Sequence, residues 1–105
     1  VSDKIKLLCS FIDQSKKDVE ELNSAIENCN RKKLRETVHR MLPMWKLLHN
    51  EEMLFAYRSL LKDERASDTA LKEYTQRIIN HTDMLMAAAK NEIKRQTNET
   101  ENTDS

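Results

Sequence analysis

The sequence predicts an all-α domain, an antiparallel four-helix bundle. The 105 residues include no glycine and only one proline, Pro43, whereas tight hairpins and phosphate-cradling loops depend on glycine. Leu, Lys, Glu, Ala, Met and Arg are abundant, and all of them favour helix. Apolar side chains recur at helical spacing in segments joined by short links, which is typical of a bundle.

The first helical segment covers residues 4–28. Its apolar stripe consists of Ile5, Leu8, Ile12, Val19, Leu22 and Ile26. Asp13-Gln14-Ser15 interrupts the stripe, and Ser15 followed by Asp18 resembles a capping box with Asp in place of Glu. The pattern fits either a short helix followed by a second one, or one helix that bends near residues 13–15.

Three more helices follow. Asn30 is a good N-cap for a helix from Arg31 to about Leu48. A third segment covers 51–61, with an apolar side made of Leu54, Tyr57, Leu60 and Leu61. Ser67 is a plausible cap for the last helix, from Asp68 to about Lys94. The buried stripe of that helix is expected to be Leu71, Tyr74, Ile78, Leu85, Ala88 and Ile93. We therefore expect one domain over 1–95 and a disordered polar tail over 96–105.

Composition excludes several function classes. The chain has 18 basic and 18 acidic residues, which argues against a nucleic-acid or other polyanion partner. No apolar run approaches the roughly 20 residues that cross a bilayer, and no signal peptide is visible, so we expect no membrane contact by this domain. Cys9 and Cys29 match no CxxC motif, and small buried thiols in a reducing compartment are expected. The start at Val1 suggests a fragment of a longer protein.

The helix from Arg31 carries the most informative residue, His39. A helix advances about 100° per residue. The side of this helix away from His39 is apolar and is expected to face the core, through Leu34, Thr37, Val38, Met41, Met44, Trp45 and Leu48. His39 therefore points to solvent, with Lys32, Arg35 and Lys46 beside it. An exposed imidazole is nucleophilic near neutral pH and can carry a phosphoryl group, whose charge nearby cations would offset. Geometry alone, however, favours an ordinary solvated face.

A resemblance to a known family favours a phosphate-carrying histidine over an ordinary solvated face. From about Ile5 to Ile93, the chain resembles the histidine phosphotransfer (HPt) domain of bacterial phosphorelays. The family signature is His-x-Leu-Lys-Gly-Ser, and the corresponding stretch here is His39-Arg40-Met41-Leu42-Pro43-Met44. The lead-in also matches, through Leu22, Ile26, the turn at 28–30, Leu34 and Val38. The segment His-Arg-Met-Leu-Pro-Met-Trp resembles the variant of this signature found in hybrid sensor kinases of Bacteroidetes-type bacteria.

The resemblance implies that His39 is the phosphoacceptor. Arg35, one turn before His39, is the first choice of phosphate partner, with Arg40 as a further supporting cation. Lys46 lies almost directly above His39 and leans toward it, although it starts about 10 Å along the axis. Glu36 is expected to orient the imidazole.

Two positions depart from the family. Leu42 stands where the family has lysine, and Pro43 where it has glycine. Proline has no amide hydrogen, so Pro43 leaves the carbonyl of His39 without its helical donor and should kink the helix. These departures support an alternative reading, a non-catalytic, degenerate HPt module that still docks receiver domains or other partners.

The resemblance further implies receiver (response-regulator) domains as partners. A receiver phosphorylated on aspartate would dock over His39 and supply its own Mg²⁺, so the domain itself would bind no cofactor. It would be a phosphotransfer intermediate rather than an autonomous kinase, within a cytoplasmic or membrane-anchored hybrid sensor histidine kinase. We expect a mixed apolar and basic docking surface that includes Phe11 of the first segment. The sequence carries no signal for or against a dimer.

A metal enzyme is a weaker alternative. His39 and His49 are ten residues apart and face different directions, and the chain has neither HExxH nor a histidine pair four apart. His81 falls near the core edge of the last helix, where a packed or capping role is commoner than metal ligation.

Overall fold

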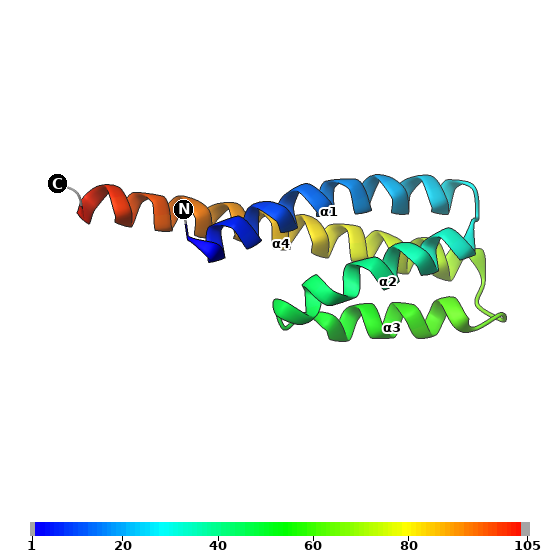
Figure 1. Cartoon of the computed structure of the whole chain (residues 1–105). Coiled ribbons are helices and arrows are strands. Elements are labelled where there is room, and N and C mark those ends of the chain that lie inside the picture. The colour runs from blue at the N-terminus through cyan, green and yellow to red at the C-terminus, as the bar shows by residue number, and fades with distance from the viewer. Residues whose placement is uncertain (1, 104–105) are drawn as a thin grey trace.

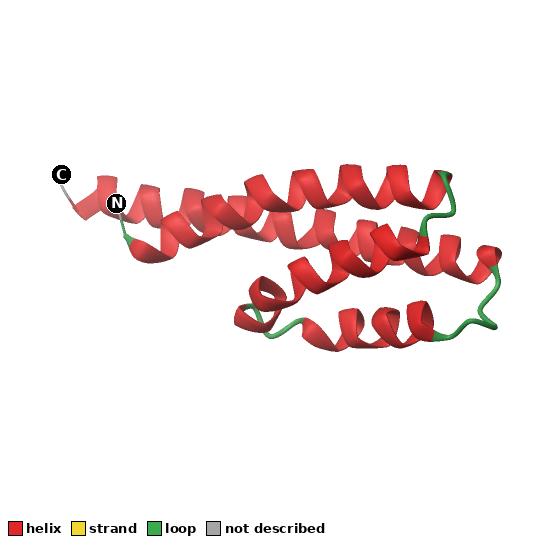
Figure 2. Cartoon of the chain, turned by 45° about the vertical axis from the view of Figure 1, so that its right-hand side comes forward, coloured by secondary structure: helices red, strands yellow, loops and turns green. Residues whose placement is uncertain are grey.

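The computed structural model describes residues 2–103, with side chains through residue 98. Four helices follow one another: α1 Asp3–Glu27, α2 Arg31–Leu47, α3 Glu51–Lys62 and α4 Asp68–Thr103. Successive helices run antiparallel, α1 and α3 each pack against α2 and α4, and the described residues form no strand (Figures 1 and 2). This arrangement confirms the predicted all-α four-helix bundle.

The core lies along the centre of the bundle and draws on all four helices. Its largest fully buried side chains include Trp45, Tyr57, Phe11, Leu22, Leu34, Met41, Leu54, Leu61, Leu71 and Ile78. On α2, the buried residues are Leu34, Thr37, Val38, Met41, Leu42 and Trp45. The predicted core face of this helix is therefore confirmed, with Met44 and Leu48 half-buried at its edge.

The first helix is continuous, with no break near residues 13–15. Ser15 and Asp18 are buried in the middle of α1, so the interpretation of these residues as a capping box is wrong. Asp18 instead forms an ion pair with Arg40 of α2. The apolar stripe is interrupted because the α1–α2 interface contains a polar pair at this point. The N-cap of α1 is Ser2, whose hydroxyl accepts from the Ile5 amide at 3.2 Å.

Two helix ends use left-handed backbone without glycine. Cys29 follows α1 with φ 51° and His49 follows α2 with φ 58°. After α1, the Cys29 amide donates to Ile26 and the Asn30 amide to Ala25; after α2, the His49 amide donates to Lys46 and the Asn50 amide to Trp45. Both patterns are Schellman motifs, in which glycine is the usual residue at the left-handed position.

The predicted caps of α2 and α4 are confirmed. The Asn30 side chain accepts from the Lys33 amide at 3.1 Å, and the Ser67 hydroxyl accepts from the Ala70 amide at 3.1 Å. One expected member of the α4 stripe is misplaced by a residue, because Ala89 is buried and Ala88 is exposed. Along a helix, adjacent residues differ by about 100° in direction, so a stripe edge is easily misjudged by one position.

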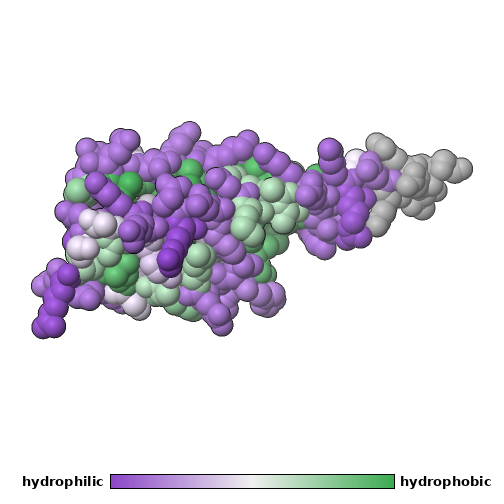
Figure 3. Space-filling view, turned by 180° about the vertical axis from the view of Figure 1, so that it is seen from behind, coloured by the Kyte–Doolittle hydropathy of each residue, from purple (hydrophilic) through white to green (hydrophobic). Residues whose placement is uncertain are grey.

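The last helix continues beyond its predicted end near Lys94. Its final turns project past the N-terminal end of α1, and the part described there is largely hydrophilic (Figures 1 and 3). A helical stretch without a packing partner is marginal in water. The expected boundary at residue 95 thus lies close to the point where α4 leaves the bundle. The expectation of a disordered tail from residue 96 stays a prediction, and it falls in part on residues outside those described.

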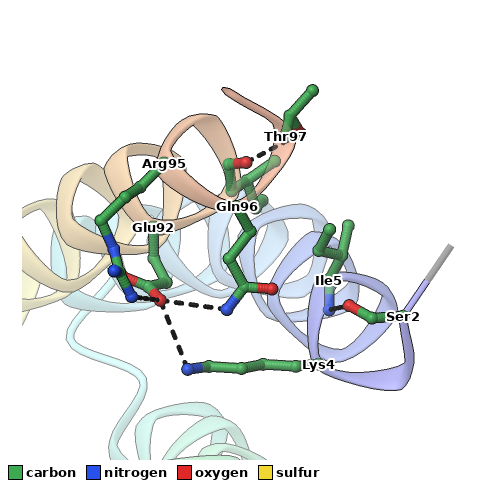
Figure 4. Close-up of polar contacts among 8 residues, drawn as sticks. Ser2, Lys4, Ile5, Glu92, Arg95, Gln96 and Thr97 are labelled. Atoms are coloured by element: carbon green, nitrogen blue, oxygen red, sulfur yellow. Dashed lines mark hydrogen bonds and ion pairs between the residues drawn. The ribbon is translucent and has the colours of Figure 1, made fainter. Parts of the chain in front are cut away.

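The half-buried carboxylate of Glu92 links α4 to the start of α1 just before this projection. Glu92 accepts from Arg95 and Gln96 of its own helix and from Lys4 of α1 (Figure 4). These donors, Arg95 first, lower the pKa of Glu92 to about 2. The contact ties the two terminal segments of the domain together.

Two expectations about surface residues are wrong. Phe11 is 2% exposed because it lies on the core stripe of α1, one turn after Leu8, so it is not part of a docking surface. Cys9 and Cys29 are exposed rather than buried. Cys9 lies on the solvent side of α1 and Cys29 occupies the turn after it. None of the described helices is long and apolar enough to cross a membrane.

Candidate functional site

His39 lies near the middle of α2 and its side chain is exposed. Its sequence neighbours Thr37, Val38 and Met41 are buried in the core, which leaves the imidazole on the outward side of the helix. None of the described residues forms a hydrogen bond or ion pair with the ring. The predicted exposure of His39 is therefore confirmed, and both ring nitrogens are open to a partner.

An open groove between α2 and α3 contains the His39 side chain. Its volume is about 260 Å³, and its lining consists of Arg35, Glu36, His39, Arg58 and Lys62. Arg35 and Glu36 come from the helical turn before His39, as the sequence predicts. Arg58 and Lys62 reach the same groove from α3. The site therefore combines one imidazole, three cations and one carboxylate.

The two α3 cations were not predicted from the sequence. Arg58 and Lys62 are four residues apart and so share one side of α3, next to the buried stripe of Leu54, Tyr57 and Leu61. The apolar stripe of α3 could have indicated that this side borders the core, with Arg58 half-buried and Lys62 exposed. Its position beside His39 depends on how α2 and α3 pack against each other, for which the sequence carries no readable signal.

Arg40 directs its side chain away from the groove, toward α1. Its guanidinium donates to Asp18 Oδ1 at 2.7 Å and also to Glu21. The hydrogen bonds that Arg40 donates to these carboxylates, Asp18 first, raise the pKa of Arg40. The Arg40 hydrogen bond in turn lowers the pKa of Glu21. This expected supporting cation is thus committed to the α1–α2 interface.

Lys46 is also engaged elsewhere. Its ammonium lies 5.6 Å from the ring centroid of Phe55 on α3, a distance at which a cation is attracted to the aromatic face. It does not line the groove that contains His39. The sequence predicts correctly that Lys46 lies on the same side of α2 as His39. Its ammonium group, however, is held over the exposed Phe55 ring, further along the helix.

The two departures from the family signature have different environments. Leu42 is 5% exposed and belongs to the core, so its side chain makes no polar contact at the site. Pro43 is exposed and lies inside α2 without ending the helix. Because proline has no amide hydrogen, the carbonyl of His39 lacks its helical donor. The surface one turn after His39 carries no long side chain at residue 43.

The other two histidines lie apart from this groove. His81 is half-buried, where its ring packs 5.4 Å from the Trp45 ring and its Nε2 lies 3.1 Å from Asn50 Oδ1. The expected packed role for His81 is confirmed. His49 is exposed at the turn after α2. Among the side chains described, residues 2–98, no three His, Cys, Asp or Glu residues gather as metal ligands would.

Comparisons of the chain with protein-family models, with curated proteins and with solved structures found no match. Inferences about function therefore depend on the groove and on the sequence motif around His39.

Proposed function

We propose that this domain is a histidine phosphotransfer module of a bacterial two-component phosphorelay, in which His39 accepts a phosphoryl group from a receiver phosphoaspartate and passes it to another receiver. The observation that carries the proposal is the exposed His39 imidazole in a groove with Arg35, Arg58 and Lys62. Phosphoryl transfer depends mainly on positioning and on charge stabilisation, and this groove offers a nucleophile and cations together.

The transfer step is a direct displacement at phosphorus. The lone pair of one His39 ring nitrogen forms the N–P bond while the P–O bond of the acyl phosphate breaks. The aspartate carboxylate leaves with the electron pair of that bond, and the other ring nitrogen releases its proton to solvent. Transfer to the next receiver reverses these changes. The receiver's own Mg²⁺ and lysine would stabilise the charge on the transferring group.

The surface beside the groove suits a protein partner. Phe55 is 43% exposed and Leu47 60% exposed, and Pro43 and Leu47 lie within roughly 80° of the direction of His39 on α2. Exposed aromatic and aliphatic side chains next to charged groups are typical of interfaces. In this proposal Phe55 and Leu47, rather than Phe11, form the apolar part of the docking surface. The phosphorelay would lie in the cytoplasm, within a hybrid sensor kinase.

The proposal can be tested by incubating the domain with receivers of the parent organism that carry a labelled phosphoaspartate. The expected product is a label on the domain that is labile in acid and stable in base, as a phosphohistidine is. His39→Gln should abolish the label. His49→Gln is the matched control, because His49 is also exposed but lies outside the groove, and this variant should keep the label.

A second candidate function is a non-catalytic module that docks receivers. It is favoured by the burial of Leu42 where the family has lysine and by the contact of Lys46 with Phe55. Receiver binding without any label, measured by calorimetry with the same receivers, would support this candidate over phosphotransfer.

A further inference from the structure

We infer that Arg58 and Lys62 of α3 hold the phosphate dianion at His39, together with Arg35 of α2, in the role that the HPt signature gives to a lysine on the histidine's own helix. The inference rests on the proposed function for its covalent ligand, a phosphoryl group on His39. The groove itself would bind any small tetrahedral phosphate dianion.

The charge balance of the groove is the first argument. Its lining has three cations and one carboxylate, Glu36, so two positive charges remain uncompensated. Some basic side chains elsewhere in the described chain form ion pairs, as Arg31 does with Asp68 and Arg40 with Asp18. Arg35, Arg58 and Lys62 form none among the described residues. Uncompensated cations in a concave surface raise the local concentration of anions.

The position of the cations is the second argument. Arg35 and His39 are one turn apart on α2, while Arg58 and Lys62 face them from α3. A dianion attached to the ring would therefore meet positive charge from two helices. Arg58 is half-buried, which restricts its guanidinium more than a fully exposed side chain would be. The planar fork of arginine suits two phosphate oxygens, and lysine adds a point charge.

The third argument is that α2 supplies little positive charge of its own near His39. Leu42 is apolar and buried, and the Lys46 ammonium is held over the Phe55 ring. Only Arg35 remains on α2 as a cation in the groove. The nearest replacement for the missing lysine thus comes from the neighbouring helix.

The test is a titration of the isotope-labelled domain with inorganic phosphate at low ionic strength, followed by NMR at the His39 ring. The variants are Arg58→Gln, Lys62→Gln and the double variant, with Arg58→Lys to keep the charge and Lys46→Gln for comparison. Arg77→Gln and Lys72→Gln are matched controls, since both residues are exposed on α4 and outside the groove lining. Amide spectra check that each variant is folded.

Saturable shifts of the His39 ring are expected for the unaltered domain. Each single Gln variant should weaken the apparent affinity about threefold to tenfold, and the double variant by more than tenfold. Arg58→Lys should recover most of the loss, and the two controls should match the unaltered domain. No saturable shift, an unchanged double variant, or a larger effect from Lys46→Gln than from Lys62→Gln would overturn the inference.

The outcome is separable from that of the proposed function. If receivers label His39 but the α3 variants bind phosphate normally, phosphotransfer stands and this role of α3 is wrong. If phosphate binding depends on Arg58 and Lys62 but no receiver labels His39, the groove is a phosphate site and the phosphotransfer proposal is wrong.

Discussion

Arg40 and Asp18 form an ion pair across the α1–α2 interface, with 2.7 Å between Arg40 Nη2 and Asp18 Oδ1. The Asp18 side chain is only 4% exposed and also accepts from Gln14. A buried carboxylate needs such partners, because burial without them costs several kcal/mol. The pair therefore fixes α2, and with it His39, against α1.

Removal of this cation should destabilise the fold. In Arg40→Ala, Asp18 keeps only the Gln14 amide, and we expect the free energy of unfolding in urea to fall by about 2–3 kcal/mol. Asp18→Asn in the same background should recover part of the loss, because no unpaired charge is then buried. Lys72→Ala, on the exposed face of α4, should change stability by about 0.5 kcal/mol or less. An Arg40→Ala effect as small as this control would show that the ion pair is not needed.

The contribution of Glu21 should depend on pH. Its Arg40 hydrogen bond lowers the folded-state pKa below the ordinary value of 4.5. A carboxyl with a depressed folded pKa stabilises the protein above the unfolded pKa, and this stabilisation is lost as the pH falls through the folded value. Glu21→Gln should therefore be less stable than the unaltered domain at pH 7, with a difference that shrinks once the pH is below 4.5. Urea unfolding at both pH values would measure it, and an equal difference at both would contradict the assignment.

Glycine at the two left-handed positions should stabilise the domain. Cys29 and His49 have φ of 51° and 58°, a region that costs most residues about 1 kcal/mol or more relative to glycine. Cys29→Gly and His49→Gly should each raise the free energy of unfolding by about 0.5–1 kcal/mol, measured by thermal or urea unfolding. Lys17→Gly, at an exposed position inside α1, is the control and should lower stability by about 1 kcal/mol. If Cys29→Gly and His49→Gly lower stability as the control does, the left-handed backbone at residues 29 and 49 is wrong.

Alkaline pH should destabilise the domain through Tyr57. Burial raises the pKa of this phenol to about 12, although its hydrogen bond with Thr75 acts in the opposite direction. A phenol whose folded pKa is raised stabilises the fold below its unfolded pKa, and this contribution is lost as the pH rises from about 10 to about 12. A titration of phenolate absorbance should show one late-ionising tyrosine that is absent in Tyr57→Phe. Ionisation of Tyr57 near pH 10 with the fold intact would be inconsistent with its burial.

Most of the fold could be predicted because helical periodicity and caps are local signals. The starts of α2 and α4 follow from Asn30 and Ser67, whose side chains accept from backbone amides three residues later. The interpretation failed where a tertiary contact replaced a local one. Ser15 and Asp18 resemble a cap in sequence, but the partner of Asp18 is Arg40, 22 residues away. Phe11 was misplaced for a related reason, since its core packing depends on which face of α1 meets the other helices.

Only the α2 half of the site could be predicted from the sequence. The exposure of His39 and the nearness of Arg35 and Glu36 follow from the geometry of a single helix. Arg58 and Lys62 belong to another helix, and nothing in their local sequence indicates that α3 places them beside residue 39. Helix geometry also overestimated the site, because two cations near His39 on α2 point elsewhere. Phe55 holds the side chain of Lys46 away from the groove. Asp18 and Glu21 hold that of Arg40.

The most direct test of the phosphotransfer proposal is to locate the phosphoryl group after incubation with a phosphorylated receiver. Mass spectrometry at neutral pH, with a fragmentation method that preserves phosphoramidate bonds, would identify the modified residue. The proposal predicts a single phosphoryl group on His39 that returns to a fresh receiver when one is added. No modification from any receiver of the parent organism, or a phosphoryl group on a residue other than His39, would contradict it.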